Sequence, residues 1–164
     1  DVGSDKRIWH FDPIPGECWE GGFVGTNDYG ISLNRDVAAE KATFAENKDA
    51  WRYGGGSAWS TPAIDTKTDT LYFGTGNPSP QMNDISRPGD NLYTVSLVAL
   101  NTETGKLKWY YQQVPHDLWG YDLASPPVLF NYKKNGKSLP AVGQASKTGW
   151  YYVNDEVTGK VLIK

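Results

Sequence analysis

Trp59 and Asn77 are the residues whose types and spacing point most directly to chemistry in this chain. Trp59 ends the stretch GGGSAW, and Asn77 follows it by eighteen residues within GTGNP. Glycines let a backbone approach a flat ligand closely, because they carry no side chain. An indole offers a broad π-face, and an amide oxygen suits a hard cation such as Ca²⁺. The pattern therefore predicts a site for a flat cofactor and a metal ion.

Two charged residues are further candidates. Asp122 ends the segment PHDLWGYD, and Lys147 lies within SKTG. A carboxylate can act as a general base, and an ammonium group can stabilise an anion. Each candidate also has a structural interpretation. Trp59 can be a packing aromatic, Asn77 a turn former between Gly and Pro, and Lys147 a solvated side chain beside a turn.

The longest motif is the run 59–80, WSTPAIDTKTDTLYFGTGNPSP. It resembles the signature of the pyrroloquinoline quinone (PQQ) dehydrogenases, the quinoprotein alcohol and sugar dehydrogenases built on a β-propeller. It departs from that signature at Ile64 and Thr70. The loop RPGDN at 87–91 also resembles the family, as does PHDLWGYD, where the family has PHDxWDxD. The resemblance implies an all-β propeller and a PQQ-dependent oxidoreductase.

The resemblance also implies roles for the candidate residues. It implies that Ser57, Trp59 and Lys147 bind the cofactor, with the PQQ ring against Trp59 and Lys147 at the quinone's carbonyl edge. It implies that Asn77 is a ligand of a Ca or lanthanide ion, which acts as a Lewis acid on the quinone. Asp122 corresponds to a position that adds a metal contact in the quinoproteins that use lanthanides.

The family's general base is missing from the matching segment, because its position is occupied by Gly120. Two residues along an extended strand return a side chain to the same face. Asp122 is therefore the candidate catalytic base, with metal binding as its competing role. If the site is otherwise intact, Gly120→Asp should raise activity. His116 and Asp117 are predicted to hold the loop rather than to act in catalysis.

The implied reaction is oxidation of a primary or secondary alcohol or of a sugar hydroxyl. A base removes the hydroxyl proton while a hydride passes to the quinone. The resemblance further implies a periplasmic location and electron transfer to cytochrome c or a membrane quinone. Two alternatives stay open: a non-catalytic propeller scaffold, and a descendant that binds PQQ without turnover. A scaffold does not need GGGSAW, GTGNP or Lys147, so these features favour a cofactor site.

A repeat predicts how the blades are arranged. The segment 99–109 consists of a strand, a tight turn and a strand that closes with Trp109, and 153–163 repeats it. Trp9 closes a half-copy 100 residues before Trp109, which fits a unit of about 50 residues if a copy at 64–72 has lost its Trp. We expect 1–164 to form a partial quinoprotein propeller domain. This domain would hold about three blades of a larger, eight-bladed propeller within a longer polypeptide.

Strands are expected where aromatic and aliphatic residues gather between turn signals, at 71–73, 96–100, 107–111, 127–132 and 150–153. One helix is expected at 37–47, because this segment is rich in Ala and Glu and follows Asp36, a good N-cap.

Composition excludes several classes of protein. The 164 residues carry a net charge of −3, with no basic stripe to neutralise phosphates, so a nucleic-acid partner is not expected. The single cysteine, Cys18, allows no disulfide within the chain. No apolar run approaches the roughly 20 residues of a membrane span, and the first residues lack the apolar stretch of a signal peptide.

Overall fold

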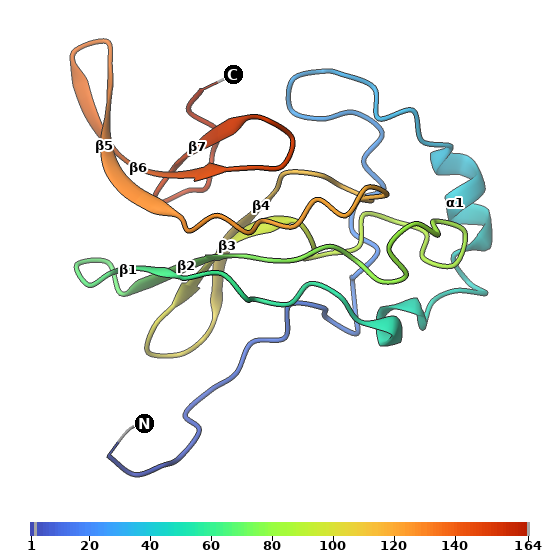
Figure 1. Ribbon diagram of the computed structural model, residues 1–164, viewed down its shortest axis with the longest axis horizontal. Coiled ribbons are helices and arrows are strands. Elements are labelled where there is room, and N and C mark those ends of the chain that lie inside the picture. Colours follow the sequence, from blue (N-terminus) through green and yellow to red (C-terminus); the bar gives the residue numbers. More distant parts are fainter. Residues whose placement is uncertain (2, 164) are drawn as a thin grey trace.

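The computed structural model describes residues 1 and 3–163, which form two antiparallel sheets (Figure 1). In each sheet, every strand pairs with the next one along the chain, which is the meander expected of a propeller blade. The first sheet consists of β1 (Ala63–Asp65), β2 (Thr70–Gly74), β3 (Ser96–Asn101) and β4 (Leu107–Gln112). The second consists of β5 (Val128–Lys134), β6 (Lys137–Ala145) and β7 (Tyr151–Asp155).

Strand β3 lies at the centre of the core and is buried on both faces. Leu97 and Ala99 pack with Tyr72 and Trp109 toward Val142 of the second sheet. The alternate residues of β3, Val98 and Leu100, pack with Phe73 against the N-terminal segment that carries Trp9 and Phe11. Alternation along the strand thus joins two layers, which explains why this segment reads as a continuous apolar run.

The predicted tryptophan repeat is confirmed by two docked indoles. Trp9 donates its indole N–H to the Thr102 carbonyl at 2.9 Å, and Trp109 donates to the Glu156 carbonyl at 3.0 Å. Each indole lies against a glycine of the next turn. A Cβ on Gly105 would come within 2.5 Å of Trp9, and a Cβ on Gly159 within 2.7 Å of Trp109. The repeat therefore ties the N-terminal segment to the first sheet and the first sheet to the second.

We expect Gly159→Ala to destabilise the fold more than Gly136→Ala does. The two glycines have similar positive φ values of 71° and 75°, so alanine is strained at both. Only at Gly159 would the new methyl group press on an indole, since nothing lies within 4 Å of a Cβ at Gly136. Overpacking costs about 1–3 kcal/mol, and the free energies of unfolding in urea should differ by that amount. Equal losses would contradict the docking contact.

The expectation of a further copy of the repeat at 64–72, one that has lost its Trp, is wrong. These residues form the β1–β2 hairpin of the first sheet, with Ile64 paired to Leu71. The turn of this hairpin resembles a docking turn, because the Asp65 carboxylate accepts hydrogen bonds from Lys67 N and Thr68 Oγ1. The 100 residues from Trp9 to Trp109 hold only one sheet, because a long segment, 12–62, precedes its first strand. This segment is called the excursion.

The excursion carries helix α1 (Val37–Thr43) and the 3₁₀ helix η1 (Ala50–Tyr53), beside the sheets at the right of Figure 1. Helix α1 is shorter than expected, and the Asp36 carboxylate caps it by accepting a hydrogen bond from Ala39 N. No residue of α1 is buried, so packing does not extend the helix beyond its first turns. Among the described residues, no helix has the length and apolar character needed to cross a membrane.

Candidate functional site

Two short segments that are distant in sequence lie side by side at the centre of the site. Gly56 N donates to the Asn77 carbonyl at 2.9 Å, and Gly76 N donates to the Ser57 carbonyl at 3.0 Å. Trp59 follows this paired stretch and is 57% exposed. The pairing of the two segments therefore explains why the motifs at Trp59 and Asn77 belong to one site.

The glycines before Trp59 have a structural task. A Cβ on Gly55 would lie 2.5 Å from the Asn77 carbonyl oxygen, and Gly55 has a φ of 99°. A Cβ on Gly56 would lie 2.7 Å from Ile14 Cδ1. The sequence predicted close approach to a ligand. The structure shows that these two glycines allow close approach within the protein itself.

Asn77, Asp122 and Lys147 meet at one point. The Asp122 Oδ1 atom accepts a hydrogen bond from Asn77 N at 2.9 Å, and Oδ2 accepts one from Lys147 Nζ at 2.8 Å. Lys147 Nζ also donates to the Gly120 carbonyl at 3.0 Å. The side chains of Asp122 and Lys147 are 21% and 47% exposed, so the pair faces solvent. The structure thus gathers three of the residues singled out in the sequence around one carboxylate.

The metal-binding potential of the site depends on Asn77. Its Nδ2 donates to the Pro78 carbonyl at 2.8 Å, which fixes the orientation of the amide group. The Oδ1 atom is then the part of the side chain that can bind a cation. No group of three or more His, Cys, Asp or Glu side chains suited to a metal occurs among the described residues. Asn77 can therefore supply one ligand of a set, and Asp122, which accepts hydrogen bonds from Asn77 N and Lys147, is the other candidate.

The segment 115–122 is held in place by the two residues predicted to be structural. Asp117 is fully buried, and its two carboxylate oxygens accept hydrogen bonds from Trp119 N at 2.9 Å and Tyr121 N at 2.7 Å. His116 Nδ1 lies 2.6 Å from the Gly89 carbonyl, to which it donates. Both side chains thus satisfy backbone groups, Asp117 within this segment and His116 on the loop 87–91.

Arg87 is a residue whose role the sequence did not reveal. Its guanidinium is fully buried and donates to the carbonyls of Pro80 at 2.7 Å, Gln81 at 2.9 Å and Asp117 at 2.6 Å. RPGDN resembles a loop of the PQQ dehydrogenases, and its arginine joins the segment after Asn77 to the segment before Asp122. A fork of several donors is suited to binding several carbonyls at once.

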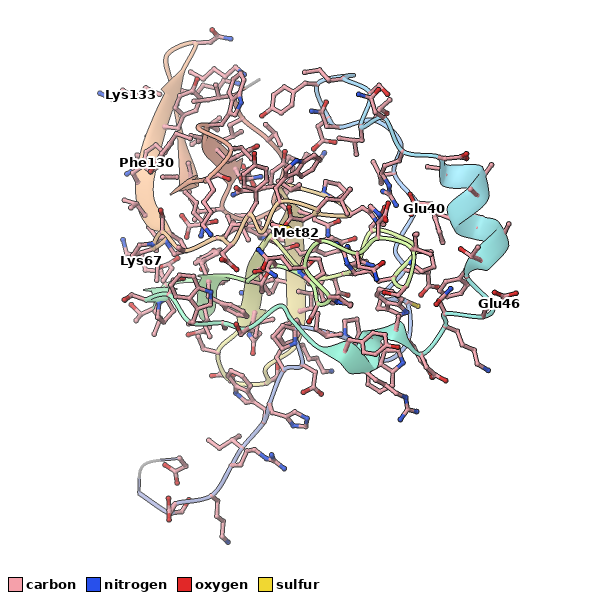
Figure 2. All side chains as sticks on the ribbon, turned by 45° about the vertical axis from the view of Figure 1, so that its right-hand side comes forward. Glu40, Glu46, Lys67, Met82, Phe130 and Lys133 are labelled. Carbon is pink, nitrogen blue, oxygen red and sulfur yellow. The ribbon has the colours of Figure 1, made fainter. Side chains whose placement is uncertain are left out.

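A buried ion cluster attaches the excursion to this loop (Figure 2, where Glu40 is labelled). Arg35 pairs with Glu40 and with Asp90, each at 2.6 Å. Burial by itself would raise the pKa of Glu40, but hydrogen bonds from Arg35 and Gly89 N outweigh it and lower that pKa. Burial lowers the pKa of His116, which is therefore neutral at pH 7.

The lowered pKa values predict that the protein loses stability in acid. A group whose pKa is lowered by folding stabilises the fold above its unfolded pKa, and this contribution disappears as the pH falls through the folded value. For His116 the loss begins near pH 6.5, its ordinary pKa. We expect His116→Asn, which keeps a donor for Gly89, to flatten the fall in melting temperature below that pH. His10→Asn, at an exposed histidine, is the control, and equal slopes in the two variants would contradict the prediction.

Antiparallel sheets joined by a docked tryptophan are typical of a β-propeller. The Asp122–Lys147 pair lies on loops outside these sheets. The family model "PQQ: Glucose/ethanol/alcohol dehydrogenase, beta-propeller domain" matches residues 1–164. The chain therefore belongs to the propeller family of PQQ-dependent dehydrogenases. This confirms the predicted family and the predicted all-β propeller fold.

Known relatives agree with this family. The quinoprotein alcohol dehydrogenase PedH of Pseudomonas putida is 43% identical over 99% of this chain and 28% of its own length. The structure of a europium-containing methanol dehydrogenase has a TM-score of 0.67 and 33% identity over 70% of this chain and 20% of its own. The structure of the quinohemoprotein alcohol dehydrogenase from Comamonas testosteroni has a TM-score of 0.66 and 32% identity, and it covers 84% of this chain and 21% of its own. The chain spans less than a third of the length of these relatives.

Proposed function

We propose that this chain forms part of an enzyme that oxidises an alcohol or sugar hydroxyl with PQQ as its cofactor. The observation that carries the proposal is the Asp122 carboxylate, which accepts hydrogen bonds from Asn77 N and Lys147. Asn77 lies on the segment that pairs with the residues before the exposed Trp59. A site of this kind combines a proton acceptor, a cation and an aromatic face. The quinoprotein alcohol dehydrogenases related to the chain support the substrate class.

Asp122 is the proposed proton acceptor. A carboxylate has more lone pairs than the two hydrogen bonds that Asp122 accepts, so an oxygen can still approach a substrate hydroxyl. Its two donors hold the carboxylate at one orientation, as a base requires. Lys147 has a second task, because its positive charge lies where it can stabilise negative charge developing on a bound group.

The residues around this pair fit a flat, anionic cofactor. Trp59 exposes its indole, and Ser57 is exposed two residues before it. We propose that the ring lies against Trp59, that Ser57 and Lys147 contact polar groups at its edge, and that the Asn77 amide binds an accompanying Ca or lanthanide ion. When bound, PQQ supplies the acceptor for the two electrons of the alcohol. The europium in a related structure supports the choice of metals.

The remaining partners follow from the family. We propose a periplasmic enzyme that passes its electrons to a cytochrome c or to a membrane quinone. The quinohemoproteins among the relatives support a haem acceptor. Purified full-length protein should therefore reduce an added c-type cytochrome in the presence of alcohol and PQQ, and a faster reaction with an added quinone would select the other acceptor.

Reconstitution of the full-length apoprotein tests the proposal. Addition of PQQ with Ca²⁺ or La³⁺ should quench tryptophan fluorescence and start dye-linked oxidation of short alcohols. Trp59→Ala should raise the Kd for PQQ at least two- to tenfold, the share that stacking contributes beyond burial. Trp150→Ala is the control, because Trp150 is as exposed but stacks on Tyr29.

The two alternatives give different results in this experiment. A non-catalytic scaffold would bind no PQQ, and the fluorescence would not change. A descendant without turnover would bind PQQ through Trp59 but oxidise no alcohol. Equal PQQ affinity in Trp59→Ala and the parent would remove Trp59 from the site.

A further inference from the structure

The side chain of Gln81 fills the space beside Gly120. A Cβ on Gly120 would lie 1.8 Å from Gln81 Nε2 and 2.9 Å from its Cδ. Atoms that are not bonded do not come that close, so a side chain at 120 would displace the Gln81 carboxamide from this position. Gly120 therefore does not leave an empty place in the site. A carboxamide from another segment occupies it. Gln81 directly precedes Met82, which is labelled in Figure 2.

The protein holds Gln81 and Gly120 together through buried contacts. The Arg87 guanidinium donates both to the Gln81 carbonyl and to the Asp117 carbonyl, at 2.9 and 2.6 Å. Asp117 in turn fixes Trp119 N and Tyr121 N, the two residues that flank Gly120. Because Arg87 is fully buried, these bonds are shielded from water. The backbones on both sides of the contact are thus fixed.

This contact adjoins the proposed catalytic pair. The Gly120 carbonyl accepts a hydrogen bond from Lys147 Nζ, which also binds Asp122. Gln81 is exposed, and its carboxamide forms no hydrogen bond with any residue in the part of the chain that the structure describes. A polar group with two donors and an acceptor is thus available to a ligand beside Gly120, two residues before the proposed base.

We propose that Gln81 binds the substrate hydroxyl and positions it against Asp122, an inference that rests on the proposed function. An amide cannot remove the proton, because it is not a base at neutral pH. Asp122 receives the hydroxyl proton, so the interaction left to Gln81 is donation of an Nε2–H to the hydroxyl oxygen. A bound oxygen that is held from two sides has a fixed orientation, which raises the rate of the chemical step.

The first test is Gln81→Ala in the full-length, PQQ-loaded protein. We expect kcat/KM for a short alcohol to fall about tenfold, as for the loss of one hydrogen bond. The melting temperature and the Kd for PQQ should stay at the parent values, because Gln81 bonds to the protein through its backbone. Met82→Ala changes the neighbouring exposed side chain and should leave all three quantities unchanged.

The second test measures the contact itself without any turnover. Gly120→Ala should lower the melting temperature, and the loss should be smaller when Gln81→Ala is present, because neighbours that share a space are not additive. Gly120→Asp carries a further cost, because Gly120 has a φ of 74°, at which any other residue is strained. The rise in activity expected of Gly120→Asp from the sequence is therefore opposed by the backbone with either residue at 81.

The outcomes separate this inference from the proposed function. Unchanged kcat and KM in Gln81→Ala would overturn the positioning role, even if the melting temperatures show the contact. Additive melting temperatures would overturn the contact. A parent protein that binds no PQQ or oxidises no alcohol would overturn the proposed function and the substrate role of Gln81 together, while the melting temperatures still decide the contact.

Discussion

Replacing Asp122 with Asn is expected to lower turnover of the full-length protein about 10²–10⁴-fold, the usual contribution of a general base. Asparagine has the same size, and its Oδ1 can still accept a hydrogen bond from Asn77 N or Lys147 Nζ. It cannot take a proton from the substrate, so the loss falls on kcat. Dye-linked alcohol oxidation measures the rate, and quenching of tryptophan fluorescence shows that PQQ still binds.

The matched control is Asp36→Asn on helix α1. Asp36 is exposed and caps the helix, a task that asparagine performs equally well. Turnover should therefore stay at the parent value. Unchanged turnover in Asp122→Asn would remove Asp122 as the base. A loss of PQQ or metal affinity in that variant, with no loss of kcat, would instead identify Asp122 as a metal contact.

Most of the sheet could be predicted from the sequence, because apolar and aromatic residues gather between clear turn signals. The expected strands at 96–100 and 107–111 each fall one residue short of β3 and β4. Strand β6 was missed because Pro140 and Gly143 lie within it, and both residues usually indicate a break. Pro140 is tolerated because it pairs with β5 alone, since the pairing of β6 with β7 begins at Ala141.

Only those residues of the candidate site that lie within recognisable motifs could be predicted from the sequence. Spacing brought Trp59, Asn77 and Lys147 to attention, and the structure places Asn77 and Lys147 on the same carboxylate. The contact between Gln81 and Gly120 could not be predicted, because it joins segments 39 residues apart through a buried arginine. Sequence patterns report which faces are apolar. They do not report which side chain fills the space beside a glycine.

The effect of Lys147→Met separates the two tasks proposed for Lys147. Methionine keeps much of the length of the side chain but removes the charge and both hydrogen bonds, to Gly120 O and Asp122 Oδ2. Loss of a group that stabilises developing charge typically costs about 10²–10³ in kcat, and we expect a fall in that range. Lys133→Met, at an exposed lysine of β5 labelled in Figure 2, should have no effect.

Combination with Asp122→Asn then shows how the pair acts. If Lys147 serves chiefly to hold Asp122 as a base, Lys147→Met should cost little once Asp122 is asparagine, because residues that act as a unit are strongly non-additive. If Lys147 acts on the bound cofactor, the fold-losses in kcat of Lys147→Met and Asp122→Asn should multiply in the double variant. Lys147→Arg keeps the charge and should restore most of the rate in either case. A Lys147→Met variant with parent kcat would exclude both tasks and leave Lys147 as a solvated side chain beside its turn.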